Sequence, residues 1–212
     1  MIKCISKFKI LLLSIGFMFT GTSMMAQSSL TLDASQVIST FKFTDSEGSK
    51  DKSYSASYSG AYSVGYRNAT DFGLIIRASI GMHKAGATLM YDSANYMWTL
   101  QYADAKLGVG YIYNGDRFSP YLTVSSYLGF LLKANQTLNN QDFDIKKSKS
   151  LTNIDQGILI SSGVQITLSD DISAYTEFSY RMGLKNIETN DNGQKATNIA
   201  YALTLGLAFT IK

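Results

Sequence analysis

The sequence predicts an all-β protein, an eight-stranded antiparallel up-and-down transmembrane β-barrel. Three observations lead to this fold class. Apolar and polar residues alternate with a period of two in eight segments, and the connections between these segments alternate between long and short. No stretch after Phe19 approaches the roughly eighteen consecutive apolar residues that a membrane-spanning helix needs.

The first 26 residues have the pattern of a secretory signal peptide. A start that contains three lysines is followed by an almost wholly apolar stretch at 10–19 and by a short polar region that ends at Ala26. About ten apolar residues of helix cover only about 15 Å, half of a hydrocarbon core, so this stretch is too short for a membrane anchor. We expect cleavage after Ala26 and a barrel domain over residues 27–212.

Removal of the signal segment also changes the charge and the cysteine content. The chain has 19 basic and 16 acidic residues, but Lys3, Lys7 and Lys9 lie in the signal segment, which leaves 16 of each sign. A neutral chain lacks the basic face of a nucleic-acid-binding protein, so no nucleic-acid partner is expected. The single cysteine, Cys4, is also removed, which excludes disulfides and cysteine metal sites.

The alternation predicts where the strands lie. In residues 54–66 the even positions carry Tyr, Ala, Gly or Val, and the odd positions carry only Ser, Ala or Gly. A soluble barrel would hide its bulky residues and expose charge, whereas here the bulky face runs for about ten residues per strand without a charge, as lipid contact requires. The other strands are expected at about 36–44, 71–83, 95–113, 119–133, 154–168, 172–184 and 197–211.

The segment 95–113 departs from the regular alternation. Its first bulky residues, up to Tyr102, occupy even positions, and those from Ala105 onward occupy odd positions. Either a β-bulge near 102–104 absorbs one residue, or the upper part of the strand lies beyond the membrane, where no alternation is imposed. Aromatic residues near the strand ends predict two interfacial girdles, with Tyr66, Phe72, Tyr111, Tyr113 and Phe118 near the short turns and Phe43, Tyr54, Tyr96 and Trp98 near the long loops.

The connections predict the topology. Long polar segments at 45–53, 84–94, 134–153 and 185–196 alternate with tight turns at 67–70, 114–117 and 169–171. Four long and three short connections place both chain ends on the short-turn side, which is the arrangement of bacterial outer-membrane barrels.

Signal peptide, eight strands, three tight turns, four long loops and a closing apolar strand together resemble the OmpA/OmpX-type family of eight-stranded outer-membrane β-barrels. The resemblance covers the whole mature chain and rests on architecture, so it implies a fold and a cellular location more than an activity. It implies the outer membrane of a Gram-negative bacterium, contact with outer-membrane lipid and lipopolysaccharide, and no cofactor.

Some barrels of this shape modify lipid A, which requires an acyl-transfer site. The single histidine, His83, together with Asp92 and Ser93, supplies the residue types of an acyl-transfer triad. Deacylases of this kind carry a serine two positions after the histidine, but position 85 here is Ala. We therefore expect a non-enzymatic protein, and a solvent-facing histidine at a strand end.

Three acids suggest a calcium site. Asp142 and Asp144 lie in the third long segment, with Asp155 nearby. No twelve-residue calcium loop is present, and lysines interrupt the acids, so we expect a solvated loop and no metal. Those lysines at 146, 147 and 149 are instead suited to lipopolysaccharide phosphates.

The favoured function is that of a structural or adhesive surface protein, with a lumen filled by side chains and with loops that contact the envelope, a host surface or another protein. A transporter or pore is the first alternative, and a lipid A-modifying enzyme the second. The strand phases turn six charged residues inward: Lys42, Arg77, Asp104, Lys106, Glu177 and Arg181. We expect Glu177 to accept from Arg77, with Lys106 as a second donor, and Arg181 to pair with Asp104.

Overall fold

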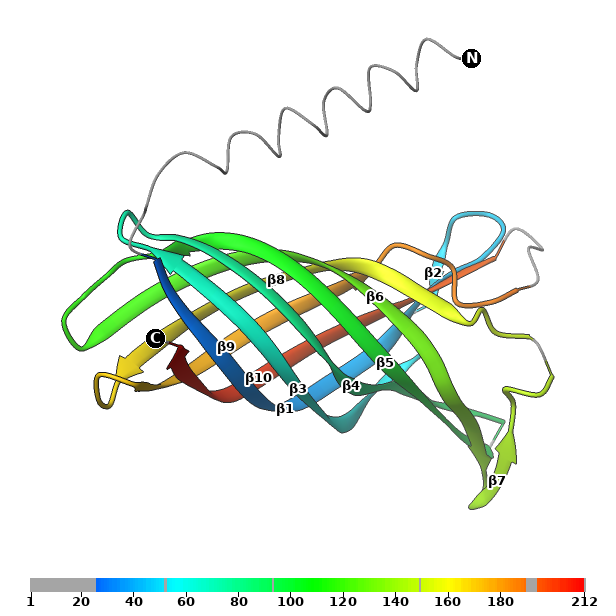
Figure 1. The fold of residues 1–212 in the computed structure, drawn as a ribbon. Coiled ribbons are helices and arrows are strands. Elements are labelled where there is room, and N and C mark those ends of the chain that lie inside the picture. The colour runs from blue at the N-terminus through cyan, green and yellow to red at the C-terminus, as the bar shows by residue number, and fades with distance from the viewer. Residues whose placement is uncertain (1–25, 52, 93, 149, 190–193, 212) are drawn as a thin grey trace, which may run out of the picture.

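A computed structural model describes residues 26–51, 53–92, 94–148, 150–189 and 194–211, and it forms a closed barrel (Figure 1). The predicted signal segment up to residue 25 lies outside the described residues. The eight long strands are β1 (Ala26–Thr44), β3 (Ser55–Thr70), β4 (Leu74–Tyr91), β5 (Ala94–Ile112), β6 (Phe118–Leu138), β8 (Ile154–Thr167), β9 (Ile172–Gly183) and β10 (Lys195–Ile211). Two short strands, β2 (Lys50–Asp51) and β7 (Gln141–Asp144), pair with β1 and β6.

The ring follows the chain order, and every neighbouring pair is antiparallel. It closes between the first and last strands, where β1 and β10 pair without a break from Ser28–Ile211 to Thr44–Lys195. Closure leaves no long strand with an unpaired edge, which is what a sheet surrounded by lipid requires. The predicted fold class is therefore confirmed. Within the described residues, no helix is long and apolar enough to cross a membrane.

The two ends of the barrel differ, and we call them the turn end and the loop end. The turn end holds the connections 71–73, 113–117 and 168–171. The first of these turns depends on Gly73, whose φ of 95° suits glycine and whose amide donates to Thr70 at 2.9 Å. The predicted turn at 67–70 is wrong, because β3 remains paired up to Thr70.

The loop end holds the connections 45–54, 92–93, 139–153 and 184–194. The predicted long loop at 84–94 is wrong, because β4 continues to Tyr91 and pairs with β5 down to Ala94. Its connection is a tight turn, with Asp92 at a φ of 47°. Both strands continue past the alternating region, where large and small residues are mixed on both faces, so the period-two pattern fades although the pairing does not.

Strand β5 keeps one phase throughout, so the predicted slip near 102–104 does not lie in this strand. Its even positions point inward, including Leu100 and Tyr102, each 1 % exposed. The register shift falls in the partner strand β6, where the pair Gln101–Lys133 is followed by Tyr102–Leu131. Leu132 and Lys133 are consequently both exposed, which is the signature of a β-bulge.

Strand β1 begins ten residues before the predicted start, and this changes its phase. Its lipid-facing residues are even-numbered, with Leu30 and Leu32 about half exposed, whereas Val37 is 5 % exposed. The predicted inward position of Lys42 is therefore wrong, because Lys42 is exposed while Phe41 packs against the core.

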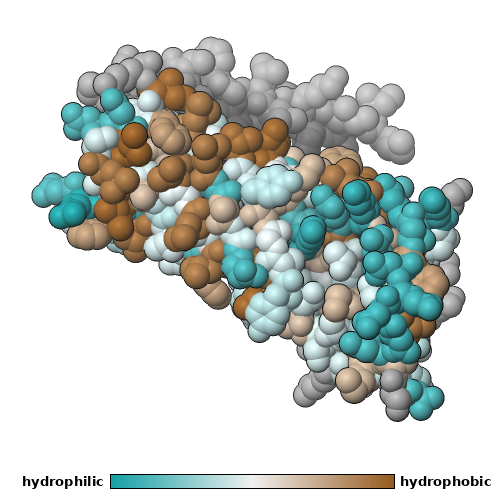
Figure 2. All heavy atoms as spheres, turned by 90° about the horizontal axis from the view of Figure 1, so that it is seen from below, coloured by the Kyte–Doolittle hydropathy of each residue, from teal (hydrophilic) through white to brown (hydrophobic). Residues whose placement is uncertain are grey.

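Apolar side chains cover the outer face of the barrel. Figure 2 shows them as a brown region toward the turn end, with hydrophilic residues gathered at the loop end. Every long strand contributes, and one half-exposed example from each is Leu30, Tyr62, Ile80, Leu107, Val124, Ile160, Phe178 and Leu205. The turn-end aromatics of the predicted girdle also lie on this face, whereas Phe43, Tyr96 and Trp98 of the predicted loop-end girdle belong to inward-facing positions.

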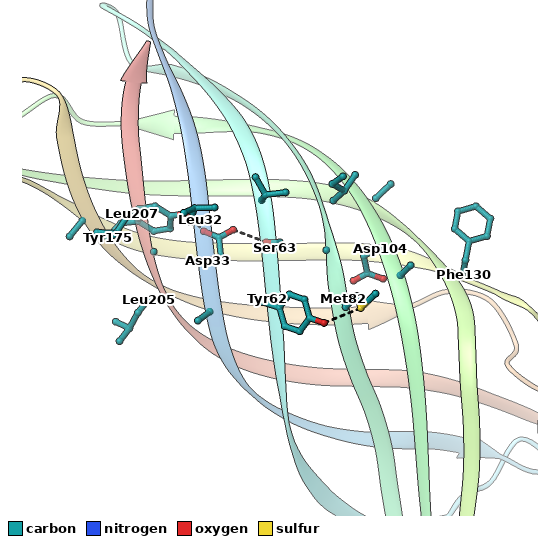
Figure 3. A pocket seen from close by; sticks show the side chains of 18 residues that line it. Leu32, Asp33, Tyr62, Ser63, Met82, Asp104, Phe130, Tyr175, Leu205 and Leu207 are labelled. Atoms are coloured by element: carbon teal, nitrogen blue, oxygen red, sulfur yellow. Dashed lines mark hydrogen bonds between the residues drawn. The ribbon is translucent and has the colours of Figure 1, made fainter. Parts of the chain in front are cut away.

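Figure 3 shows how one stretch of wall separates its two faces. The Ser63 hydroxyl donates to Asp33 at 2.7 Å on the inner face. The neighbouring Tyr62, on the outer face, donates instead to the sulfur of Met82 at 3.0 Å. Adjacent residues of one strand therefore belong to two environments, as the pleat requires.

Candidate functional site

The candidate site is the inner face of the barrel, which carries charged residues of both signs. Among the described residues, four cations and four acids point inward, so the formal charges balance. They are Asp33, Arg67, Arg77, Asp104, Lys106, Asp155, Glu177 and Arg181. A charge in such a place is costly unless a partner and hydrogen bonds compensate for its lost hydration.

The middle of the lumen is crossed by two acid-centred contacts. Arg77 of β4 donates to Glu177 of β9, and the Tyr121 hydroxyl donates to the same carboxylate at 3.0 Å. Beside them, the Tyr175 hydroxyl donates to Asp33 of β1. Strand β10 lies between these two partners and has Gly206 at this level, where a Cβ would overlap the Tyr175 ring. Glycine at this position therefore leaves room for the tyrosine to reach across.

Nearer the loop end, Asp104 joins an arginine and the histidine. Arg181 donates to Asp104 at 2.6 Å, and His83 Nδ1 lies 2.8 Å from the same oxygen. Arg181 also approaches His83 Nε2 at 3.0 Å, so a neutral imidazole with its proton on Nδ1 satisfies both neighbours. The Arg181 guanidinium lies 4.1 Å from the centre of the Tyr127 ring, which adds a cation–π contact.

Two further inward charges complete the set of directly bonded groups. Toward the turn end, Arg67 donates to Gln165, whose amide donates to Ser173 at 3.2 Å. Toward the loop end, Asp155 is fully buried and accepts from Asn198 at 2.9 Å and from Tyr127 at 3.3 Å. Both charges are therefore held by neutral hydrogen-bonding partners.

Lys106 is held differently. It makes no ion pair within the part of the chain that the structure describes, and it faces a cavity of about 60 Å³ in the middle of the lumen. Such a volume accommodates about two water molecules. The acids Asp33 and Asp104 attract its charge without forming an ion pair with it, and the guanidinium groups of Arg181 and Arg77 repel it.

The structure brings together five of the six predicted lumen residues and leaves out one. Arg77, Glu177, Arg181 and Asp104 form the contacts described above, whereas Lys42 is on the outer face. Lys106 lies beside them, but the prediction that it is a second donor to Glu177 is wrong, because it makes no such contact. Sequence reasoning missed four inward polar residues, Asp33, Arg67, His83 and Asp155, as members of this group. The observed phase of β1 would have found Asp33, and the observed end of β3 would have found Arg67, since both share odd positions with the small residues of their strands.

The loop end of the lumen is covered by apolar side chains. A buried cluster includes Leu100, Tyr102, Leu131 and Ile187, and Phe41 and Leu151 pack against it. Two loops meet above this cluster. The Thr189 amide donates to Ser150 at 2.9 Å and the Thr152 amide donates to Ile187 at 2.8 Å, which ties 184–194 to 139–153.

The structure does not bring the candidate catalytic residues together. His83 is 3 % exposed within the wall, so the expected solvent-facing histidine at a strand end is wrong. Asp92 lies in the hairpin turn nine positions later, about 30 Å further along an extended strand. Ser93 lies outside the described residues.

The candidate calcium ligands also lie apart. Asp142 is exposed and accepts from Thr137 at 2.5 Å, and Asp144 lies 3.6 Å from Lys147. Asp155 is buried in the lumen. Within the described residues, no group of three or more His, Cys, Asp or Glu side chains is arranged to hold a metal ion.

Comparison with known proteins assigns this barrel to a family. A family model described as "Outer membrane protein beta-barrel domain" matches residues 22–189. The chain belongs to this family. No curated protein sequence matches this outer-membrane barrel.

Among similar solved structures, the first one named here shares this fold at a TM-score above 0.5, and two others have lower scores. Neisserial surface protein A is 12% identical, with 88% of this chain and 99% of that chain covered and a TM-score of 0.53. Ail, the attachment invasion locus protein of Yersinia pestis, is 13% identical, with coverages of 89% and 100% and a TM-score of 0.48. OprG from Pseudomonas aeruginosa is 9% identical, with coverages of 87% and 97% and a TM-score of 0.46. The family and the lipid-facing surface place this outer-membrane barrel in the bacterial outer membrane, as the sequence predicts.

Proposed function

We propose that this outer-membrane barrel is a structural and surface-interaction protein without enzymatic activity, whose lumen is sealed by its own side chains. In this proposal the barrel is a rigid mount, and its loop end faces the cell exterior to contact envelope components, a host surface or another protein. The observation that carries the proposal is the inner face itself, with its balanced charges, bonded acids and covered loop end.

The dimensions of the barrel favour sealing. An eight-stranded barrel has an interior that side chains just fill. Here tyrosines extend into it, and the ring of Tyr121 lies so close to Gly163 on the neighbouring strand that a Cβ there would come within 2.6 Å of it. The charge pairs would have to separate for ions to pass, which would leave buried charges without partners.

Outward lysines favour contact with lipopolysaccharide. Lys84 pairs with Gln101 across β4 and β5, and Gln101 pairs with Lys133 across β5 and β6, which forms a polar row on the outer face. Lys42 and Lys195 are exposed at the loop end of β1 and β10. Cations at the edge of the apolar surface are suited to the phosphates of the outer leaflet.

Liposome swelling tests the sealed mount against the transporter alternative. Proteoliposomes that contain the full mature barrel are expected to swell in isotonic small sugars no faster than protein-free liposomes, with a porin as the positive control. Swelling at the porin rate would reject the sealed lumen and favour a pore.

Lipid A mass spectrometry tests the enzymatic alternative. Expression of the barrel is expected to leave the mass of lipid A unchanged, because His83 is held between Asp104 and Arg181 and lies far from Asp92. The loss or gain of an acyl chain on expression, abolished by His83→Ala, would show that the barrel is an enzyme.

A further inference from the structure

The loop end contains a cavity that the proposed structural role does not explain. Its volume is about 340 Å³, which is within the range of small-ligand sites. The walls come from seven parts of the chain: the end of β1, the connection 45–54, the start of β5, the end of β6, the loops 139–153 and 184–194, and the start of β10. The cavity therefore lies above the apolar cluster that covers the lumen.

Aromatic rings dominate one wall of this cavity. Phe41, Phe43, Tyr54 and Trp98 all line it. Tyr54 is central, with its ring centre 6.2 Å from that of Phe41, 6.0 Å from that of Phe43 and 5.9 Å from that of Trp98. The rings are tilted against one another by 37–62°, so they form a continuous aromatic surface and not a parallel stack.

The opposite wall carries one acid. Glu188 lines the cavity next to Gln194, in a loop whose backbone is fixed by the pairing of Leu151 with Glu188. Burial raises the pKa of the Glu188 carboxyl, and no described residue donates a hydrogen bond to it or forms an ion pair with it. Among the described residues that line the cavity there is no lysine or arginine. The described lining therefore favours a cation over an anion.

We propose that this cavity binds a small organic ammonium ion, whose alkylated cationic group lies against the aromatic wall and faces Glu188. The negative faces of aromatic rings attract a cation placed within about 6 Å of the ring centre, and alkylated ammonium groups suit such sites because they are weakly hydrated. A purely apolar ligand would leave the Glu188 carboxylate without a partner inside the site.

The single tryptophan of the chain makes this site directly observable. Trp98 lines the cavity, so the intrinsic tryptophan fluorescence of the whole protein reports on it alone. The probe is choline, and its uncharged isostere is 3,3-dimethylbutan-1-ol. Titration of each into the refolded full barrel in detergent micelles is expected to give a saturable change in emission for choline, with an affinity about tenfold higher than for the isostere, a ratio that corresponds to 1.4 kcal/mol.

Two substitutions separate the charge from the aromatic wall. Glu188→Gln is expected to lower the affinity for choline about tenfold, to that of the isostere, without changing the binding of the isostere. Phe43→Leu keeps an apolar wall and removes one ring, so it is expected to weaken choline binding more than isostere binding. Glu47→Gln is the matched control, because Glu47 is an exposed acid at the same end of the barrel and does not line the cavity.

These binding measurements test the ligand proposal independently of the sealed lumen, because they report on the cavity at the loop end alone. Each variant is first shown to fold by its migration on a gel with and without boiling. Equal affinity for choline and its isostere, or an affinity for choline that is unchanged in folded Glu188→Gln, would overturn the proposal. The absence of saturation by choline up to millimolar concentrations would also overturn it, as would saturation by a neutral methyl glycoside alone.

Discussion

At the scale of single residues, the lumen contacts show what a sequence can reveal about a barrel. The alternation puts Arg77, Glu177 and Arg181 on the inner face, and equal heights above their turns bring partners from facing strands together. Lys42 and Asp33 could not be placed in this way, because the phase of β1 is set by residues 28–38 and the aromatic residues at 41 and 43 point into the mouth. A bulky residue does not identify the lipid face where the lumen itself is apolar.

Removal of one lumen acid tests the importance of these contacts. Glu177→Ala leaves Arg77 without its ion-pair partner and the Tyr121 hydroxyl without an acceptor. We expect a loss of about 3–5 kcal/mol in the free energy of unfolding, measured by urea titration in detergent micelles. Asp142→Ala removes an exposed acid and serves as the control, with an expected change below about 0.5 kcal/mol. Equal stability of the two variants would contradict a stabilising role for the lumen acid.

Gly73 and Gly48 allow a matched test of turn geometry. Both have a positive φ, 95° for Gly73 and 84° for Gly48, but a Cβ on Gly73 would overlap the carbonyl oxygen of Ile112 whereas nothing lies within 4 Å of one on Gly48. Each change to Ala is expected to cost about 1 kcal/mol from backbone strain, and Gly73→Ala more because of the overlap. A larger loss of unfolding free energy in Gly48→Ala would refute this explanation.

At the scale of strands and loops, the membrane-spanning parts were predictable and the extensions beyond them were not. Six of the eight predicted inner and outer faces agree with the observed burial, because lipid outside and polar groups inside impose strict alternation on each strand. The β4–β5 hairpin continues past that region, where its backbone pairing is joined by the packing of Ala85 and Leu100 into the buried cluster of the loop end. The bulge in β6 could not be predicted either, because an apolar residue followed by a polar one, Leu132 and Lys133, fits ordinary alternation in the sequence.

Trypsin on intact cells tests the orientation of the loops. Lys147 lies in the 139–153 loop with its side chain 88 % exposed, so we expect the first cut there, or at the neighbouring lysines 146 and 149. Lys149 lies outside the described residues. Lys147→Gln should slow the cleavage, and N-terminal sequencing of the fragments identifies the site. A first cut after Arg117, in a connection at the turn end, would invert the topology.

At the scale of the whole molecule, closure of the ring predicts resistance to detergent. Every long strand is paired on both sides, so the barrel has no free edge at which unfolding can begin. We expect the unboiled protein to migrate differently from the boiled protein on a gel that contains dodecyl sulfate. Identical migration of the two samples would argue strongly against a closed barrel.

The central claim is that the inner face seals the barrel, and planar-bilayer recording tests it most directly. The purified full barrel is expected to show no long-lived conducting state, because charge pairs and tyrosine side chains cross its interior. Glu177→Ala, which breaks one pair, is expected to add at most brief openings. Long-lived channels of porin size in the wild-type protein would contradict the sealed lumen and make transport the favoured function.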